Sequence, residues 1–310
     1  YRLQIIYSQV THHSEDSVSI INSSLLKEGY YYPASSIKLP CALLALEKLN
    51  ELNLGGDYYF IINNDYLCGN SAHIRNSQNS KTSFYDIIKE MLVVSNNVSY
   101  NSVYEFLTPG YMKNKLREKG LNDIHIYKKF AGCNLPDNLK CNTIKFYDRN
   151  DRLLYKQDAS VLNLSEMAEN YSYGQNNLIG SYSYANHKTT KNSHDFNYNI
   201  TASLEDLHSS LIDLIYPNAM SFSNRWRLKE SDRQFLTKVL GMFPRELETK
   251  VYQDSTEYPD NLLKYIVFGD PSSNTKTNAI RTFSKIGLAY GFTTETAYVV
   301  DLVSEKDFFL

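Results

Sequence analysis

The chain has 310 residues, of which 42% are hydrophobic and 21% are charged, and its formal net charge at pH 7 is −2. A chain of this size buries one large core or two closely packed subdomains. The near balance of 32 basic and 34 acidic residues argues against a nucleic-acid or anionic-membrane partner. No apolar run in the sequence reaches the roughly eighteen residues of a membrane span.

The first part of the chain is expected to form strands. Residues 3–10 are mainly apolar, residues 17–25 alternate, and the polar segment 12–16 between them is typical of a turn. This pattern predicts a hairpin at the edge of a sheet. The chain opens with strand-like composition and no charged leader, so we expect any export signal to have been removed.

From Ser35 onward the apolar residues recur at helical spacing. Pro40 is compatible with a helix because it falls near the first turn. We therefore expect a buried helix that begins at Ser35. The residues on its broad apolar face are Ile37, Leu39, Ala42, Leu43, Leu46 and Leu49.

The middle of the chain is predicted to be mainly helical. Ser83 and Asp86 are typical of a capping box at the start of a helix that runs to Val94. The other predicted helices span residues 98–107, 111–119, 204–215 and 230–240.

Two segments interrupt the helices. Residues 143–161 contain a polar turn between β-prone stretches and are predicted to form a hairpin. Residues 170–199 are rich in Tyr, Asn and Ser and are predicted to form a long loop, which is either a polar connector or a stacking surface for sugars near a cleft. The tyrosines of that loop are Tyr171, Tyr173, Tyr182 and Tyr184.

Strand character returns at residues 281–289 and 296–302, around a turn at Tyr290 and Gly291. Strands at both ends of the chain with helices between them predict an α/β fold. We expect a discontinuous sheet domain and an inserted, mainly helical domain. The first is made of residues 1–34 and 270–310, and the second of residues 35–269 with an insertion around residues 130–200.

Four cysteines are present, and they form no C-x-x-C pair and have no histidine partners at zinc-ligand spacing. We therefore expect neither a metal site nor a cofactor. Two alternatives remain for Cys133 and Cys141: a disulfide that closes a small loop, or two free buried thiols. The other two cysteines are Cys41 and Cys68.

A covalent chemistry is indicated at the start of the first helix. A serine hydroxyl is a weak nucleophile at neutral pH and needs a base within reach. On a helix, Ser35 and Lys38 share one face, and burial near other cations favours the neutral amine of Lys38 that accepts a proton. The same S-x-x-K spacing occurs at Ser24 and Ser273, but only Ser35 opens an amphipathic helix.

Two further motifs follow in order, and together the three resemble the serine β-lactamase and penicillin-binding-protein family, most closely its class A β-lactamases. They read Ser35-x-x-Lys38, Ser95-Asn96-Asn97 and Lys285-Ile286-Gly287. The first two serines are 60 residues apart, which is similar to the separation in the class A enzymes. The resemblance covers roughly residues 1–125 and 200–302, and it implies an antiparallel sheet flanked by helices with an inserted mainly helical domain.

The resemblance also implies roles for the motif residues. Ser35 is the expected nucleophile, Lys38 its base, and Ser95 the relay that passes the proton to the leaving group. Lys285 would hold Ser95 and the substrate electrostatically, and Asn97 would bind the acyl-side amide. The backbone amides of Ser35 and Leu288, which follows Gly287, would form the oxyanion hole.

The sequence departs from the family in three places. Ile286 replaces a Thr or Ser whose hydroxyl binds the substrate carboxylate, so affinity for ordinary penicillins is in doubt. No E-x-x-L-N segment occurs; its usual interval falls near residues 131–133, and the nearest acids are Asp123 and Asp137. The family also continues into another strand and a C-terminal helix, which we expect to be truncated or missing near residues 308–310.

We predict an extracytoplasmic serine acyl-hydrolase, periplasmic or lipid-anchored, that acts on a β-lactam, a cell-wall peptide or a related amide or ester. The alternative is a penicillin-binding-like sensor or ligand-binding protein that acylates slowly or not at all, and a structural relic without covalent chemistry is the third reading. The expected partner is a small-molecule or peptide substrate, and we expect a monomer.

Overall fold

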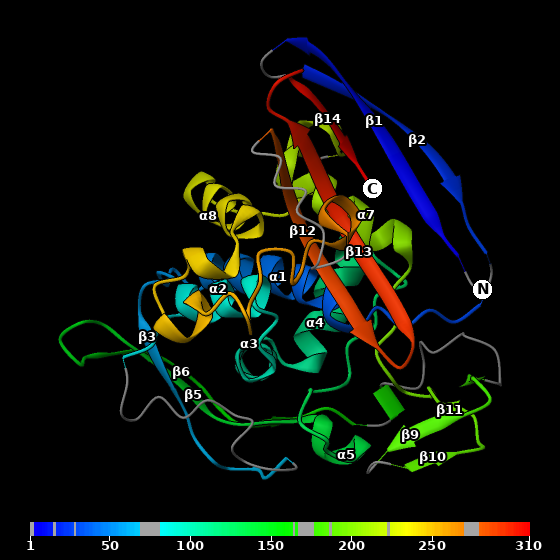
Figure 1. The fold of residues 1–310 in the computed structure, drawn as a ribbon. Helices are drawn as coiled ribbons and strands as arrows, with labels where there is room; N and C mark the ends of the chain where they lie inside the picture. Colours follow the sequence, from blue (N-terminus) through cyan, green and yellow to red (C-terminus); the bar gives the residue numbers. More distant parts are fainter. Residues whose placement is uncertain are drawn as a thin grey trace.

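Both ends of the chain contribute to one antiparallel five-stranded sheet, in the order β12-β13-β14-β1-β2. The computed structural model describes residues 3–14, 17–27, 29–68, 81–163, 165–166, 177–185, 188–221, 224–269 and 279–310. In Figure 1 the long β1–β2 hairpin (blue) stands beside the C-terminal strands (red), as the strand order requires. The strands are β1 (Ile5–Ser14), β2 (Ser17–Leu25), β12 (Ile280–Ala289), β13 (Phe292–Asp301) and β14 (Lys306–Phe309).

Both predicted terminal hairpins are confirmed. Strands β1 and β2 pair from Ile5 opposite Leu25 onward, and β12 and β13 pair along their whole length. Tyr290 and Gly291 both have positive φ angles, 52° and 79°, as a two-residue turn of this hand requires. Strand β13 begins at Phe292, four residues before the predicted start.

A further strand is present, against the expectation that it is truncated or missing near residues 308–310: β14 pairs with β13 on one side and with β1 on the other. Its four residues are too few to give a periodic signal in the sequence. The backbone of β14 finds its partners only when the N-terminal strand is brought beside it.

The predicted helices are present within a few residues of their expected bounds. The long helices are α1 (Lys38–Glu51), α2 (Phe84–Val93), α3 (Asn97–Leu107), α4 (Pro109–Glu118), α7 (Leu204–Ile215) and α8 (Glu230–Gly241), and the short ones are α5 (Leu135–Asn138) and α9 (Tyr265–Phe268). Short 3-10 turns lie at Ala34–Ile37, Pro217–Ala219, Pro244–Glu246 and Lys250–Gln253. None of the helices in the described part of the chain is long and apolar enough to cross a membrane.

Local side chains explain where the helices around the site begin. Ser83 and Asp86 form the predicted capping box of α2. Asn96 caps α3 by accepting hydrogen bonds from the amides of Val98 and Ser99. The turn between α2 and α3 is therefore short and tightly defined.

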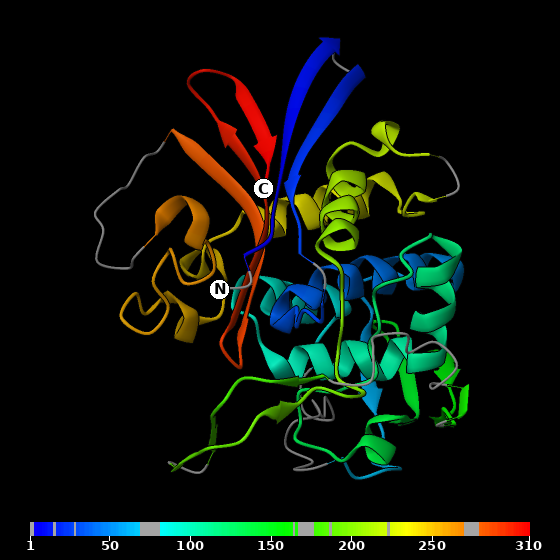
Figure 2. The same ribbon diagram turned by 90° about the vertical axis from the view of Figure 1, so that its right-hand side faces the viewer.

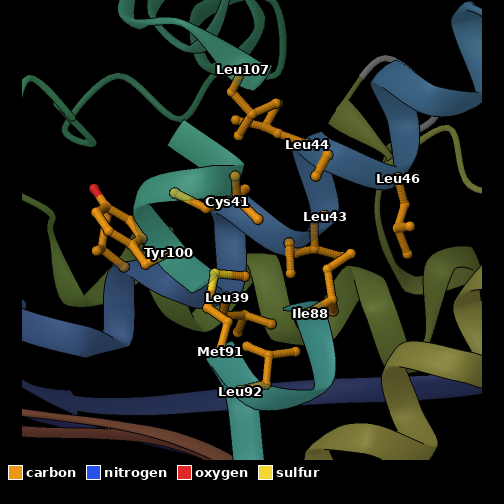
Figure 3. Packing of buried hydrophobic residues seen from close by; sticks show 14 of the residues in the cluster. Leu39, Cys41, Leu43, Leu44, Leu46, Ile88, Met91, Leu92, Tyr100 and Leu107 are labelled. Carbon is orange, nitrogen blue, oxygen red and sulfur yellow. The ribbon is translucent and has the colours of Figure 1, made fainter. Parts of the chain in front are cut away.

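Helix α1 is the centre of the core. Almost all of its residues are buried, and Figure 3 shows its apolar side chains packed against those of α2 and α3. A helix that is apolar on nearly every side is stable only inside the protein. In the view of Figure 2 the sheet stands between helices α1, α3 and α4 on one side and the segment of residues 242–269 on the other.

The 143–161 hairpin is confirmed, whereas the long loop predicted at 170–199 contains short paired strands in its described part. Strand β8 pairs with β11, and β9 pairs with β10. Tyr182, one of the tyrosines of this segment, is exposed. Tyr171 and Tyr173 lie outside the described residues. The small strands are β3 (Tyr59–Ile62), β4 (Lys140–Cys141), β5 (Ile144–Tyr147), β6 (Leu153–Gln157), β7 (Ser160–Val161), β8 (Leu178–Ile179), β9 (Ser183–Ala185), β10 (Lys188–Thr190) and β11 (His194–Asp195).

Neither alternative for the cysteines is right. Cys133 is bonded to Cys68, across 65 residues of sequence, while Cys41 and Cys141 are free and buried. The sequence reasoning considered only neighbours in the chain, and the partner comes from a segment that the fold brings alongside. The bridge ties the segment after β3 to the loop that precedes α5.

A buried ion pair holds the same loop to helix α3. Lys129 Nζ lies 2.6 Å from Glu105 Oε1, both side chains are fully buried, and Lys129 also donates to the backbone oxygen of Lys140. Glu105 in turn accepts hydrogen bonds from the backbone and side chain of Asn142. Breaking a buried pair leaves an uncompensated charge inside the protein.

Replacing Lys129 by Met is expected to lower the free energy of unfolding by about 3–5 kcal/mol, because Glu105 remains buried without its cation. The measurement is urea denaturation at pH 7. Arg149→Met is the matched control, since it removes an ion pair with Asp57 whose side chains are 85% and 51% exposed, and it should change stability little. Equal losses in the two variants would contradict the buried pair's role.

Candidate active site

Ser35 lies in the 3-10 turn that leads into α1, rather than at the first residue of the helix as predicted. Ala34 before it has a φ of 47°, a left-handed conformation that is rare for a residue with a Cβ. The hydroxyl of Ser36 is buried and donates to the carbonyl of Pro33. Ser35 is half-buried and its hydroxyl makes no hydrogen bond with the described residues, so it is the reactive candidate of the two serines.

Lys38 is fully buried, and its amine is directed to the second motif. Nζ donates to the backbone oxygen of Ser95 at 2.6 Å, to Ser95 Oγ at 3.1 Å and to Asn97 Oδ1 at 2.7 Å. Among the described residues it makes no hydrogen bond with Ser35, one turn earlier. Hydrogen bonds of catalytic groups are often long in unliganded enzymes and shorten when substrate binds.

The surroundings of Lys38 favour its neutral form. Burial lowers the pKa of Lys38 well below the ordinary value of a lysine, and the nearby Lys285 lowers it further. The side chains that face the amine are aromatic: Nζ lies 5.3 Å from the centre of the Phe130 ring and 5.9 Å from that of Tyr100. A neutral amine can accept a proton from a hydroxyl.

Ser95 joins the two lysines of the site. It lies in the turn between α2 and α3 with a φ of 55°, which directs both its backbone oxygen and its hydroxyl to Lys38. Lys285 Nζ donates to the same hydroxyl at 3.0 Å. Ser95 Oγ thus lies between two amines from distant parts of the chain.

Lys285 is fully buried on the edge strand β12, and it also donates to the backbone oxygen of Ile286 at 2.8 Å. Burial lowers the pKa of Lys285 to about 7, with a further contribution from Lys264 that Glu295 opposes. Its charge is therefore easily changed near neutral pH.

Gly287 brings strand β12 against the nucleophile turn. A Cβ at this position would lie 2.0 Å from the carbonyl oxygen of Pro33 and 2.9 Å from the amide nitrogen of Ser35, so only glycine fits. Leu288, the next residue, therefore has its backbone near that of Ser35, while its side chain is 59% exposed. Asn97 is exposed, and its Nδ2 has no hydrogen-bond partner among the described residues.

Of the two competing serines, Ser24 lies away from the site. Ser24 is exposed on β2, the strand at the opposite edge of the sheet from Lys285. Ser273 and Lys276 lie outside the described residues. Among the residues that the structure describes, no group of three His, Cys, Asp or Glu side chains is arranged to hold a metal ion.

Neither predicted alternative acid, Asp123 or Asp137, forms a hydrogen bond or an ion pair with Lys38 in the described part of the chain. Asp137 on α5 pairs instead with Lys140 at 3.0 Å. The loop that precedes α5 presents Phe130 to the amine instead, held there because its amide donates to Asn101 Oδ1. Sequence reasoning missed Phe130 because nothing local marks which loop residue faces the site.

Comparison with known proteins gives a family match for the first half of the chain. Residues 20–171, which contain the first two motifs, match the model of a family described as the beta-lactamase enzyme family. No curated protein matches the chain.

Solved structures show the same fold at low sequence identity. A mutant of the penicillin-binding protein PBP-A, solved as an acyl-enzyme complex with penicillin G, matches with a TM-score of 0.53 at 12% identity, over 99% of this chain and 79% of that one. A class A β-lactamase from Bacteroides cellulosilyticus gives 0.51 at 8% identity, over 99% and 81% of the two chains. A β-lactamase from Sphaerobacter thermophilus gives 0.50 at 9% identity, over 99% and 82%.

Replacing Gly287 by Ala should slow the reaction of Ser35 with a fluorophosphonate by about 10²-fold, because the added methyl group displaces the nucleophile turn by a distance of order 1 Å. Gly110→Ala is the control, since its Cβ would approach no atom closer than 3.8 Å. The rates are measured by gel fluorescence or mass spectrometry. An unchanged rate in the Gly287 variant would show that the close contact does not position Ser35.

Proposed function

We propose that this protein, which is serine β-lactamase-like and penicillin-binding-protein-like in family match and in fold, is a serine acyl-hydrolase that works through an acyl-enzyme on Ser35. The observation that carries the proposal is the position of Ser95 Oγ, 3.1 Å from Lys38 Nζ and 3.0 Å from Lys285 Nζ. The three side chains come from α1, the α2–α3 turn and strand β12. Although they are far apart in the sequence, the two amines meet at the hydroxyl of Ser95.

In the proposed acylation, Ser35 Oγ attacks the carbonyl carbon of an amide or ester. The neutral amine of Lys38 takes the hydroxyl proton, directly or through a water, and the carbonyl becomes a tetrahedral oxyanion. The backbone amides of Ser35 and Leu288 would stabilise that oxyanion. The hydroxyl of Ser95 gives its proton to the leaving nitrogen or oxygen and regains one from Lys38, so the acyl group stays on Ser35.

The two lysines have different parts in this scheme. Lys38 must be neutral to act as a base, and its burial and aromatic surroundings favour that state. Lys285, with a pKa of about 7, can supply the positive charge that draws an anionic substrate to Ser95. Because the two amines share one hydroxyl, protonation of one disfavours protonation of the other.

The substrate is proposed to be an amide or ester, such as a β-lactam or a cell-wall peptide. Asn97 can donate its free Nδ2 to a carbonyl on the acyl side. Ile286 has no hydroxyl for a substrate carboxylate. This favours substrates whose carboxylate is absent or is bound only by Lys285.

A slowly turning over, penicillin-binding-like sensor is the second candidate, and one observation favours it. Besides burial, the pKa of Lys38 is shifted by Lys285 and Cys41, and neither of these groups is a carboxylic acid. Where a deacylating carboxylate would be needed, the loop presents the ring of Phe130.

An oxidising, extracytoplasmic compartment is proposed from the disulfide between Cys68 and Cys133. Disulfides persist in secreted and periplasmic proteins and are rare in reducing compartments. Retention of the bond in protein purified from the native host, measured by non-reducing mass spectrometry, tests this location.

Replacing Ser35 by Ala is expected to abolish covalent labelling by a fluorescent penicillin or a fluorophosphonate, because it removes the nucleophile. Ser24→Ala and Ser273→Ala are the matched controls, since each removes the serine of another S-x-x-K sequence and should leave labelling unchanged. Intact-protein mass spectrometry gives the occupancy. Equal labelling of the Ser35 variant would refute the assignment.

Turnover is expected to be limited by deacylation. Absence of a general base typically lowers a rate by about 10²- to 10⁴-fold, so acylation should outrun hydrolysis of the adduct. If a chromogenic cephalosporin reacts with Ser35, it should therefore give a burst of about one equivalent followed by a slow phase, with the adduct on Ser35. Fast steady-state hydrolysis without a burst would mean that a deacylating group exists.

A further inference from the structure

Another buried lysine, Lys264, lies behind strand β12 and has no part in the proposed mechanism. Lys264 is 3% exposed and immediately precedes α9. Its Nζ donates to the backbone oxygen of Leu240, in the last turn of α8, at 2.7 Å and to that of Thr282, in β12, at 2.9 Å. Thr282 is three residues before Lys285, so the amine of Lys264 is hydrogen-bonded to the strand that contains Lys285.

A small cavity adjoins this amine. Its volume is about 10 Å³, and Leu240, Lys264 and Ser284 are among the residues that line it. A space of this size accommodates about one water molecule. Burial lowers the pKa of Lys264 to about 7, so this amine also gains and loses its proton near neutral pH. As an ammonium ion it has three N–H donors and two protein acceptors, and a water here would complete its hydrogen bonds.

An acidic side chain lies in the same region. Glu295 is opposite Ile286 in the β12–β13 ladder, and its Oε2 accepts a hydrogen bond from the amide of Ile266 in α9 at 2.8 Å. Its Oε1 is buried and has no hydrogen-bond partner among the described residues. Burial raises the pKa of this carboxyl, while its hydrogen bonds and the nearby Lys264 oppose that shift and favour the carboxylate. When it is ionised, its charge acts on nearby cations through a medium of low dielectric constant.

The other charged groups of this region already have partners of their own. Arg281 pairs with Glu246 at 3.0 Å, and Asp260 pairs with Arg245. The groups left to act on Lys285 are Lys264 and Glu295 from behind and Lys38 from the side of Ser95. Their effects agree with this geometry, because Lys264 lowers the pKa of Lys285 and Glu295 raises it.

We propose that Lys264 and Glu295 form a pair of opposing buried charges behind strand β12 that governs whether Lys285 is charged when it meets Ser95. Both act through Lys285 and are therefore positioning residues. The positive charge of Lys264 disfavours protonation of Lys285, and the negative charge of Glu295 favours it. The effect on catalysis rests on the proposed function, whereas the effect on the charge of Lys285 does not.

The proposal predicts shifts of opposite sign. Lys264→Gln removes the repelling charge and keeps an N–H donor, so Lys285 should titrate at higher pH. Glu295→Gln keeps the shape and removes the retaining charge, so Lys285 should titrate at lower pH. Each shift should be about one pH unit, the size expected for a unit charge several ångströms away at an effective dielectric constant of about 20.

The measurement is an NMR titration of the full chain labelled with [ε-13C]lysine, in which the Lys285 signal is identified by its loss in Lys285→Met. Lys264→Arg keeps the charge and should leave the titration of Lys285 in place. Lys238→Gln and Glu248→Gln remove the same charges at exposed positions and should shift it little. Thermal unfolding checks that each variant folds. If Lys264→Gln does not fold, the isosteric Glu295→Gln still tests the predicted direction of the Lys285 shift.

Shifts in the same direction, or none, would overturn the proposal. The pH dependence of Ser35 labelling by a fluorophosphonate is measured in parallel and should move with the Lys285 titration. If Ser35 never reacts but the two variants shift the Lys285 titration in opposite directions, the proposed function is wrong and the charge-pair proposal is supported. If Ser35 reacts and the NMR shifts are absent, only the charge-pair proposal is wrong.

Discussion

The site depends on one arrangement: two buried lysines share the hydroxyl of a single serine. Neither Lys38 nor Lys285 has a carboxylate partner among the described residues, and their amines are satisfied by Ser95, Asn97 and the backbone oxygen of Ile286. Burying an unpaired ammonium ion is so unfavourable that the group gives up its proton instead. The same burial that would destabilise an inert core thus favours the neutral amine that the proposed mechanism requires of Lys38.

The backbone is shaped to allow this arrangement. Ala34 and Ser95 both have left-handed φ angles, and Gly287 lets the edge strand approach the nucleophile turn more closely than any other residue would. Strained backbone of this kind costs of order 1–3 kcal/mol per residue and persists only where the surrounding structure enforces it. Here helix α1, the capped α2–α3 turn and strand β12 pack together and hold these residues in their strained conformations.

The departures from related proteins occur on two sides of the same centre. On one side, Phe130 faces Lys38, and on the other Ile286 and Glu295 lie next to Lys285. In the proposed mechanism, Phe130 supplies no carboxylate for release of the acyl group, and Ile286 supplies no hydroxyl for a substrate carboxylate. The proposal therefore expects acylation of Ser35 with slow turnover.

The sequence by itself determined the helices, the terminal hairpins and the three motifs, because caps, turns and apolar spacing act over a few residues. It predicted Ser35, Lys38, Ser95 and Lys285 as a group only through the order of the motifs, since nothing local shows that they meet. Only the tertiary structure decided the partner of Cys133, the strand β14, the turn of Lys38 toward Ser95, and the approach of Phe130 and Glu295. Each of these depends on which distant segment packs alongside, and the burial that sets the charges of the lysines exists only once those segments have met.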